Sequence, residues 1–152
     1  MNLTVIETLT GDALQSSGAN VVHDAFNKGA TIDASSAVPA TKVYAAEIAL
    51  SGGAYTIDLS SLATLQETLD ATGLKVQAIK LINKAGNAVM TFSEGAANGY
   101  ALLGASWTLD LLAGQEAQFY LNEAAPDVAA GDKTIDVAGT GTESFQVIIV
   151  LG

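Results

Sequence analysis

The sequence predicts an all-β protein, an antiparallel, jelly-roll-like β-sandwich of about 8–9 strands with one short helix near residues 61–70. Short segments rich in Val, Ile, Leu and Ala alternate with polar residues at a period of two, which is the period of a strand. Clusters of Gly, Asn, Asp and Pro separate these segments at spacings of about 8–12 residues, as in sandwiches. Strands do not alternate with long helical patterns and no fixed-period repeat is present, so a parallel α/β sheet and a solenoid are not indicated.

The chain is long enough for a single domain with its own core, and it divides into two parts. Residues 1–40 are predicted to form an N-terminal strand, at 2–9, and an extended arm rich in Gly, Ser, Ala, Asn and Asp. Residues 41–152 are predicted to form the β-sandwich. A loop as long as 10–40 in a compact domain is usually functional or held by a partner, so we expect the arm to contact another molecule.

A hairpin is predicted at the start of the sandwich. The strand at 41–50 has one apolar face, formed by Tyr44, Ala46, Ile48 and Leu50. The turn Ser51-Gly52-Gly53 leads to a returning strand at 55–59, which again alternates apolar and polar residues. The period then changes at 61–70, where a short helix is predicted with Ser60 or Ser61 as its cap and Gly73 after its end. The leucines at helical spacing are Leu62, Leu65 and Leu69.

The remaining strands are predicted at 74–82, 89–92, 107–111, 117–121, 135–137 and 145–151. In the first of them the apolar phase changes between Ala78 and Ile79, which indicates a bulge or a strand buried on both faces. The last strand is apolar on both faces and would aggregate as an exposed edge, so it is expected at the centre of a sheet or under another subunit. A charge at Ile148 or Val150 is therefore predicted to abolish folding or assembly.

The composition leaves little for catalysis. The chain has no Cys and no Arg, one His, and six Lys against sixteen Asp and Glu, for a net charge of −10. Most active sites need a nucleophile with a base, a metal cluster or a cationic clamp, so no enzyme, catalytic residue, cofactor or metal is predicted. The charge argues against nucleic acid and anionic membranes as partners. No apolar run reaches the about 18 residues of a membrane-spanning helix, and no signal peptide is visible.

One constellation of residues can be drawn as a hydrolase site. His23 and Asp24 are the only neighbouring His and carboxylate in the sequence, and Ser16 and Ser17 lie nearby. A catalytic triad is defined by geometry rather than by neighbours in sequence, and no G-x-S-x-G turn is present. A lone His in a loop is more often hydrogen-bonded or solvated, and we favour that interpretation.

Two binding sites are weighed in the same way. Acidic residues that can supply calcium ligands gather at Glu123, Asp127, Asp132 and Asp136. Their spacing matches no EF-hand loop, so a solvated acidic loop is favoured over a calcium site. Aromatic residues that can stack on a sugar are Tyr100, Trp107 and Tyr120. Trp107 alternates with leucines, which favours core packing, whereas Tyr120 lies on the polar face of its strand. Gly139-Thr140-Gly141 lacks the rest of a phosphate-binding motif and is predicted as a hairpin turn.

A set of turn and strand positions within residues 41–152 forms a recognisable series. Its members are Gly73 to Lys80, Asn87 with the strand after it, Ala97-Asn98-Gly99-Tyr100, Leu112-Ala113-Gly114-Gln115, Asp132 to Val137, and Phe145 to Gly152. In these stretches the chain resembles small β-rich proteins encoded among the head genes of tailed bacteriophages and related proviruses. Residues 1–40 carry no such match. The resemblance implies a virion structural protein that decorates or cements the capsid, and it transfers no catalytic residue.

The expected function is thus that of a non-enzymatic capsid decoration or cement protein, which oligomerises, as trimers, and stabilises the shell. Such proteins add buried area across seams and favour closed, symmetric oligomers. The expected partners are further copies and the major capsid protein, and the expected location is the virion, after synthesis in the host cytoplasm. The alternatives are a small jelly-roll capsid or vertex protein, and a binding module for carbohydrate or one that depends on calcium.

Overall fold

The computed structural model describes residues 3–5, 30–32, 38–64, 67–121 and 124–152. In the N-terminal part, β1 (Leu3–Val5) and β2 (Ala30–Ile32) pair antiparallel, with Thr4 opposite Thr31. The first predicted strand, at 2–9, is therefore present at residues 3–5, and its other residues lie outside the described ones. Most of the predicted arm at 10–40 lies outside the described residues.

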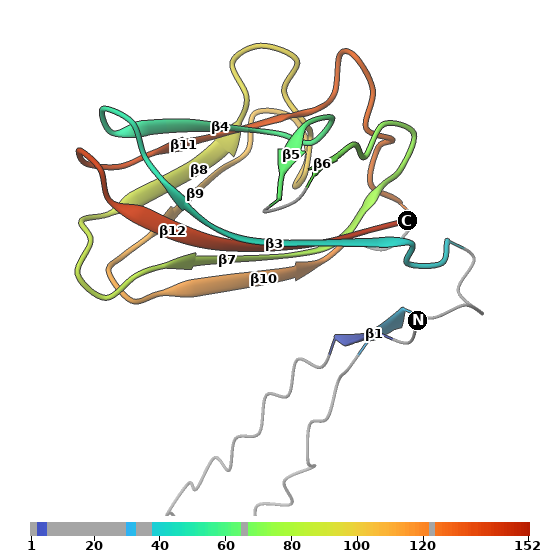
Figure 1. The fold of residues 1–152 in the computed structure, drawn as a ribbon, viewed down its shortest axis with the longest axis horizontal. Helices are drawn as coiled ribbons and strands as arrows, with labels where there is room; N and C mark the ends of the chain where they lie inside the picture. Colours follow the sequence, from blue (N-terminus) through green and yellow to red (C-terminus); the bar gives the residue numbers. More distant parts are fainter. Residues whose placement is uncertain (1–2, 6–29, 33–37, 65–66, 122–123) are drawn as a thin grey trace, which may run out of the picture.

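The sandwich consists of two antiparallel sheets of four strands each (Figure 1). The first, here the β12 sheet, has the strand order β10-β7-β12-β3, and the second, the β11 sheet, has the order β4-β11-β8-β9. The strands of the β12 sheet are β3 (Lys42–Ala49), β7 (Val76–Asn83), β10 (Glu116–Tyr120) and β12 (Ser144–Leu151). Those of the β11 sheet are β4 (Ala54–Asp58), β8 (Met90–Glu94), β9 (Thr108–Leu111) and β11 (Thr134–Ala138).

The connections between these strands define a jelly roll. Four short turns carry the chain from one sheet to the other, connecting β3 to β4, β7 to β8, β9 to β10 and β11 to β12, and the longer β4-to-β7 and β10-to-β11 connections also change sheet. These turns lie together at one end of the sandwich, on the left in Figure 1. Because the two sheets have matching orders, each strand lies across from the strand to which its turn connects it. This confirms the predicted antiparallel, jelly-roll-like sandwich.

The same topology corrects the hairpins predicted at 51–53 and 139–141, because both turns cross between the sheets. The two turns bind each other. Gly53 N donates to Gly141 O at 2.7 Å, and Gly139 N donates to Gly53 O at 2.8 Å. Gly53 has a φ of 85°, and a Cβ on it would lie 2.9 Å from Gly139 O. Glycine is needed here because two backbones approach closely, rather than because one strand folds back on the next.

The helix predicted near 61–70 is wrong, and the described residues contain no α-helix. The chain forms β5 (Leu62–Ala63) and β6 (Thr68–Leu69), which pair antiparallel with Leu62 opposite Leu69. Thr64 N donates to Glu67 O at 2.9 Å, and Thr64 Oγ1 accepts from Glu67 N at 3.0 Å. Leu62 is buried in the core and Leu69 packs against that core. Leu62 and Leu69 thus belong to two short strands with a common apolar side, and Leu65 lies outside the described residues.

β12 lies at the centre of its sheet, between β3 and β7, as predicted. Its inward side chains are buried in the core: Phe145, Val147, Ile149 and Leu151. Phe145 meets Phe92 of the opposite sheet edge to face, with 5.5 Å between the ring centroids. On the outer face Val150 is 3% exposed but Ile148 is 39% exposed. Within one copy of the chain, the outer face of this strand is therefore buried at Val150 but not at Ile148.

β7 carries the irregularity that the sequence indicates. Val150 pairs with Ala78, but the next residue of β12, Leu151, pairs with Val76, so Gln77 has no partner on β12. Every residue from 76 to 79 is buried. The structure thus contains both a register irregularity, one residue before the predicted position, and burial on both faces of the strand.

Candidate functional site

The hydrolase constellation lies outside the described residues, so it stays a prediction: its members are Ser16, Ser17, His23 and Asp24. The described candidates for calcium ligands are Asp127, Asp132 and Asp136, and Glu123 is outside the described residues. Asp127 pairs with Lys75 at 2.7 Å, and Asp136 accepts hydrogen bonds from the Thr56 hydroxyl and from a backbone N–H. Within the described ranges, no three His, Cys, Asp or Glu side chains gather in a group that could hold a metal ion.

The aromatic residues do not form a sugar platform. Tyr100 is fully buried, and its hydroxyl donates to Pro126 O at 2.7 Å and accepts from Val76 N at 3.2 Å. Burial raises the pKa of Tyr100 to about 12. Trp107 is buried as well, and its Nε1 donates to Tyr100 O at 2.9 Å. Tyr120 is 45% exposed and lies on the β12 sheet. The first two rings stabilise the fold and offer no face to a ligand.

Each described lysine is held by an acidic side chain or a backbone carbonyl. The bonds are Lys42 Nζ to Asp70 O at 2.6 Å, Lys75 to Asp127 at 2.7 Å, Lys80 to Glu116 at 2.9 Å, Lys84 to Glu47 at 2.6 Å, and Lys133 to Asp58 at 2.9 Å. These cations come from separate parts of the sheets and do not converge. The described part of the chain therefore presents no cationic clamp for an anionic substrate.

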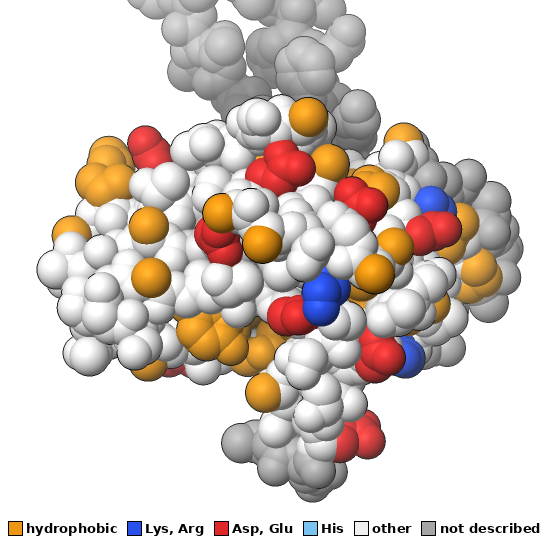
Figure 2. Space-filling model, turned by 90° about the horizontal axis from the view of Figure 1, so that it is seen from above, with side chains coloured by type: hydrophobic (Ala, Val, Ile, Leu, Met, Phe, Trp, Pro, Cys, Tyr) orange, Lys and Arg blue, Asp and Glu red, His pale blue; other side chains and the backbone are white. Residues whose placement is uncertain are grey.

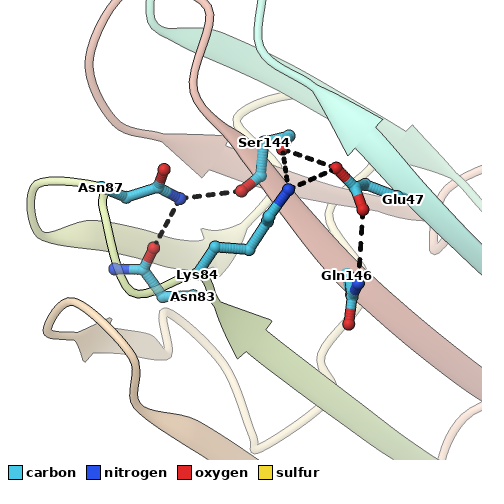
Figure 3. Close-up of polar contacts among 6 residues, drawn as sticks. All are labelled: Glu47, Asn83, Lys84, Asn87, Ser144 and Gln146. Carbon is cyan, nitrogen blue, oxygen red and sulfur yellow. Dashed lines mark hydrogen bonds and ion pairs between the residues drawn. The ribbon is translucent and has the colours of Figure 1, made fainter.

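A polar corner joins β3, β7 and β12 (Figure 3). The Glu47 carboxylate accepts hydrogen bonds from Lys84 Nζ at 2.6 Å, Ser144 Oγ at 2.9 Å and Gln146 Nε2 at 3.3 Å. The hydrogen bond from Lys84, followed by those from Ser144 and Gln146, lowers the pKa of Glu47 to about 2. Lys84 Nζ lies 3.2 Å from Ser144 Oγ. An ammonium that donates to a carboxylate has no lone pair to take the serine proton, so these residues do not form a Ser–Lys dyad.

Two asparagines next to this corner hold the turns in place. Asn83 is fully buried, and its Nδ2 donates to Ala88 O at 2.8 Å and to Leu111 O at 2.9 Å. Asn87 Nδ2 donates to Asn83 Oδ1 at 2.8 Å and to Ser144 O at 2.7 Å, as Figure 3 shows. The two amides thus connect β7, the β7–β8 turn, β9 and β12. The polar corner is a structural network that stabilises one end of the sandwich.

The outer face of the β11 sheet is polar. The outward positions that are larger than Ala carry Thr56, Asp58, Thr91, Ser93, Thr108, Asp110, Thr134 and Asp136. The Thr56 hydroxyl donates to Asp136, and the Thr91 hydroxyl donates to Asp110, each at 2.7 Å. Figure 2 looks toward the side of β4 and β11, where carboxylates are scattered among uncharged polar atoms and apolar atoms form small separate patches. This face is suited to contact with water.

The outer face of the β12 sheet differs, because about half of it is apolar. Strand pairing places one row of outward residues across the sheet, Val43, Val150, Ala78 and Tyr120. The next row consists of Ala45, Ile148, Lys80 and Gln118. The third row, toward the polar corner, consists of Glu47, Gln146, Ile82 and Glu116. We define the apolar half-face as Val43, Ala45, Ala78, Tyr120, Ile148 and Val150. Sequence reasoning identified the apolar outward residues of β12 but not the row that they form with the neighbouring strands.

The described end of the N-terminal part lies on this apolar half-face. Ala40 packs against Ala78 and Val150. Nearby, Gln77 Nε2 donates to Val38 O. The Gln77 side chain is buried, and its Oε1 accepts no hydrogen bond from a described residue. An unmade hydrogen bond at a buried amide oxygen costs about 1–3 kcal/mol. The chain therefore approaches the face at a point where a polar acceptor still needs a donor.

A scan of protein-family models, a search of curated proteins and a search of solved structures each find no match to this chain. Among the described residues, no helix has the length and apolar character needed to cross a membrane. The chemistry of the two outer faces is therefore the main structural guide to function. Fold alone does not decide it, because jelly rolls occur in capsid proteins and in lectins alike.

Proposed function

We propose that this chain is a non-enzymatic structural protein that works by self-association, as a decoration or cement protein on a virion capsid. The observation that supports this most is the apolar half-face of the β12 sheet, on which Ile148 is 39% and Tyr120 is 45% exposed. The β11 sheet of the same molecule provides the comparison, because its outward side chains larger than Ala are polar. A sheet face whose outward positions are largely apolar, with large apolar side chains left exposed on it, favours a contact with protein.

The composition and the resemblance add to this proposal. Charged residues make up 14% of the chain, whereas soluble domains carry about 25%. A shortage of charge favours burial of surface between copies. The turn and strand positions within residues 41–152 resemble those of head proteins of tailed phages, which supports a place in the virion. In that setting the chain forms trimers, contacts the major capsid protein and stabilises the shell by adding buried area across its seams.

The jelly-roll topology favours one alternative, a small capsid or vertex protein that builds a shell or spike by itself. The two functions predict different assemblies. A cement protein stops at a small closed oligomer, whereas a shell protein continues to large closed particles. A carbohydrate-binding or calcium-dependent module is less well supported, because Tyr100 and Trp107 are buried and the described acidic candidates do not gather.

Sedimentation of the purified full chain over a concentration series, with and without EDTA, tests the proposal. A discrete oligomer that persists on dilution and does not respond to EDTA supports a cement protein, with interfaces above about 1,000 Å². Large particles support the shell protein, and electron microscopy identifies them. A monomer at every concentration contradicts self-association, and a monomer that loses stability in EDTA indicates the calcium-dependent module. Detection of the chain in purified virions by mass spectrometry tests the location.

A further inference from the structure

We propose that the apolar half-face of the β12 sheet is the docking site for the N-terminal segment, residues 1–37, of a second copy of this chain. The proposal rests on the self-association proposed above and names the surfaces that carry it. Four observations support it: the chemistry of the face, the contact made by the chain that directly follows the segment, the isolated state of the β1–β2 pair, and the length of the segment.

The apolar positions of the face lie side by side on neighbouring strands. The two outermost rows of the face run across all four strands, and their apolar members are contiguous, since Val150 pairs with Val43 and Ala78, and Ile148 pairs with Ala45. Toward the polar corner the surface becomes charged, with Glu47 and Glu116. The apolar area is therefore bounded by polar groups on one side, as in protein interfaces with an apolar centre and a polar rim.

The chain that directly follows the segment is attached to this face. Ala40 lies on Ala78 and Val150, and Val38 O accepts a hydrogen bond from Gln77 Nε2. Ala40 covers Val150 and Ala78, and it leaves Ile148 and Tyr120 exposed. Gln77 Oε1 is buried without a described donor.

The N-terminal segment itself needs a surface. β1 and β2 form a ladder of two strands with three residue pairs. A two-stranded ladder of this kind is at best marginally stable in water unless it packs against something else. In Figure 1 the ladder lies outside the sandwich and is not joined to either sheet. The segment also contains apolar side chains that can fill such a face, among them Val21, Val22 and Phe26.

A second copy accounts for these observations better than the same copy. Within one chain, the described residues 38–40 cross one end of the face, and the β1–β2 ladder stands apart from it. Because Leu3 pairs with Ile32, at most about half of residues 1–37 adds to the reach of the segment. At about 3.3–3.6 Å per residue this is still longer than an eight-residue strand such as β12, so the segment can reach across a neighbouring sheet. Exchange of identical segments between copies produces closed, symmetric oligomers at low cost. Each copy then contributes one segment and one face.

Disulfide trapping tests the exchange directly, because the natural chain has no Cys. Two full-length single variants are mixed and oxidised, one with Ala45→Cys on the face and the other with Val22→Cys in the segment. The expected result is a disulfide between Ala45→Cys of one molecule and Val22→Cys of the other, identified by peptide mass spectrometry. The trap is repeated with Val21→Cys and Phe26→Cys, so that a single misplaced position does not decide the outcome. Thr108→Cys, on the exposed outer face of the β11 sheet, is the matched control and should give no enriched bond.

A charge on the face provides the second measurement. Ile148→Lys should weaken self-association at least about tenfold while the monomer stays folded, because the side chain is exposed within one copy. Thr108→Lys should leave association unchanged.

If the wild type never associates, the proposed function fails together with this inference. If the wild type associates but Ile148→Lys has no effect and no segment position is trapped, this inference alone is overturned. A double variant with both Ala45→Cys and Val22→Cys shows whether the segment lies on the face of its own molecule. A disulfide within this double variant, with no disulfide in the mixture of single variants, also overturns the inference.

Discussion

The outer face of the β11 sheet carries Thr, Ser and Asp at outward positions larger than Ala, whereas the outer face of the β12 sheet carries Val, Ile and Ala over about half of its area. Both sheets have four strands and pack on the same core. The strand geometry and the burial of the inner faces are therefore alike, and the difference lies in what each outer face contacts. One sandwich thus contains its own reference for a solvated face.

The inner side of β12 is expected to dominate stability. Phe145→Ala removes a fully buried ring that packs against Phe92 and Tyr55, and it should lower the free energy of unfolding by about 3–5 kcal/mol. Urea denaturation monitored by circular dichroism measures the change. Ile148→Ala, three residues along the same strand, is the control and should cost far less. Equal losses for the two variants would contradict the assignment of Phe145 to the core side.

A substitution at Tyr100 tests how much its hydrogen bonds to Pro126 and Val76 contribute to stability. Tyr100→Phe leaves Pro126 O without its donor and Val76 N without its acceptor, so it should cost about 1–3 kcal/mol. In the wild type the folded-state pKa is raised from 10.0 to about 12, so the folded protein keeps a proton that the unfolded chain loses. This contribution is complete below pH 10 and is lost as the pH rises toward 12. The stability of Tyr100→Phe, measured over the same range, should fall less steeply.

A substitution at Glu47 tests the polar corner, the part of the β12 sheet whose side chains are hydrogen-bonded to one another. Its folded-state pKa is lowered from 4.5 to about 2, so its contribution to stability is present above pH 4.5 and is lost as the pH falls toward 2. Glu47→Gln should therefore make the acid limb of the stability profile shallower. Thermal unfolding between pH 5 and 2 measures this. A profile that is as steep in the variant as in the wild type would show that the corner does not contribute.

The smallest effect on the monomer is expected at Ile148. At a dilution where only monomers remain, Ile148→Lys should change the free energy of unfolding by no more than about 0.5 kcal/mol, because the residue is exposed on a surface. Equilibrium unfolding at low and at high protein concentration separates this effect from association. A large loss in the monomer would mean that the segment covers Ile148 within its own chain.

Strand positions and their inward residues follow from the sequence because a period of two is a local property. The central position of β12 also follows, since its apolar character rules out an exposed edge. Turn topology does not follow, because the glycines at 51–53 are equally compatible with a hairpin and with a crossing between sheets. The prediction of a helix near 61–70 is wrong for a related reason. Leucines seven residues apart, such as Leu62 and Leu69, fit a helix, but they also fit two short paired strands that face one core.

The polar corner and the apolar half-face are not visible in the sequence, because neither is local. Ser144 Oγ bonds to Glu47 across 97 positions of the chain. Likewise, Ile148 acquires Ala45 as its neighbour through the pairing of β12 with β3. The sequence shows that Ile148 and Val150 are apolar, but it does not show that Ala40 covers Val150 and leaves Ile148 exposed. That distinction depends on where residues 38–40 cross the sheet.

The central position of β12 also determines when this fold can form. β3 and β7 both pair with β12 and not with each other. The β12 sheet therefore lacks its central pairing until residues 144–151 have left the ribosome. The strands that precede β12 must wait for it, and β3 and β7 each have an apolar edge that stays unpaired until then. Folding of the sandwich should be slow, since contacts distant in sequence carry a large entropic cost of closure. During synthesis the nascent chain is most exposed to aggregation just before β12 emerges.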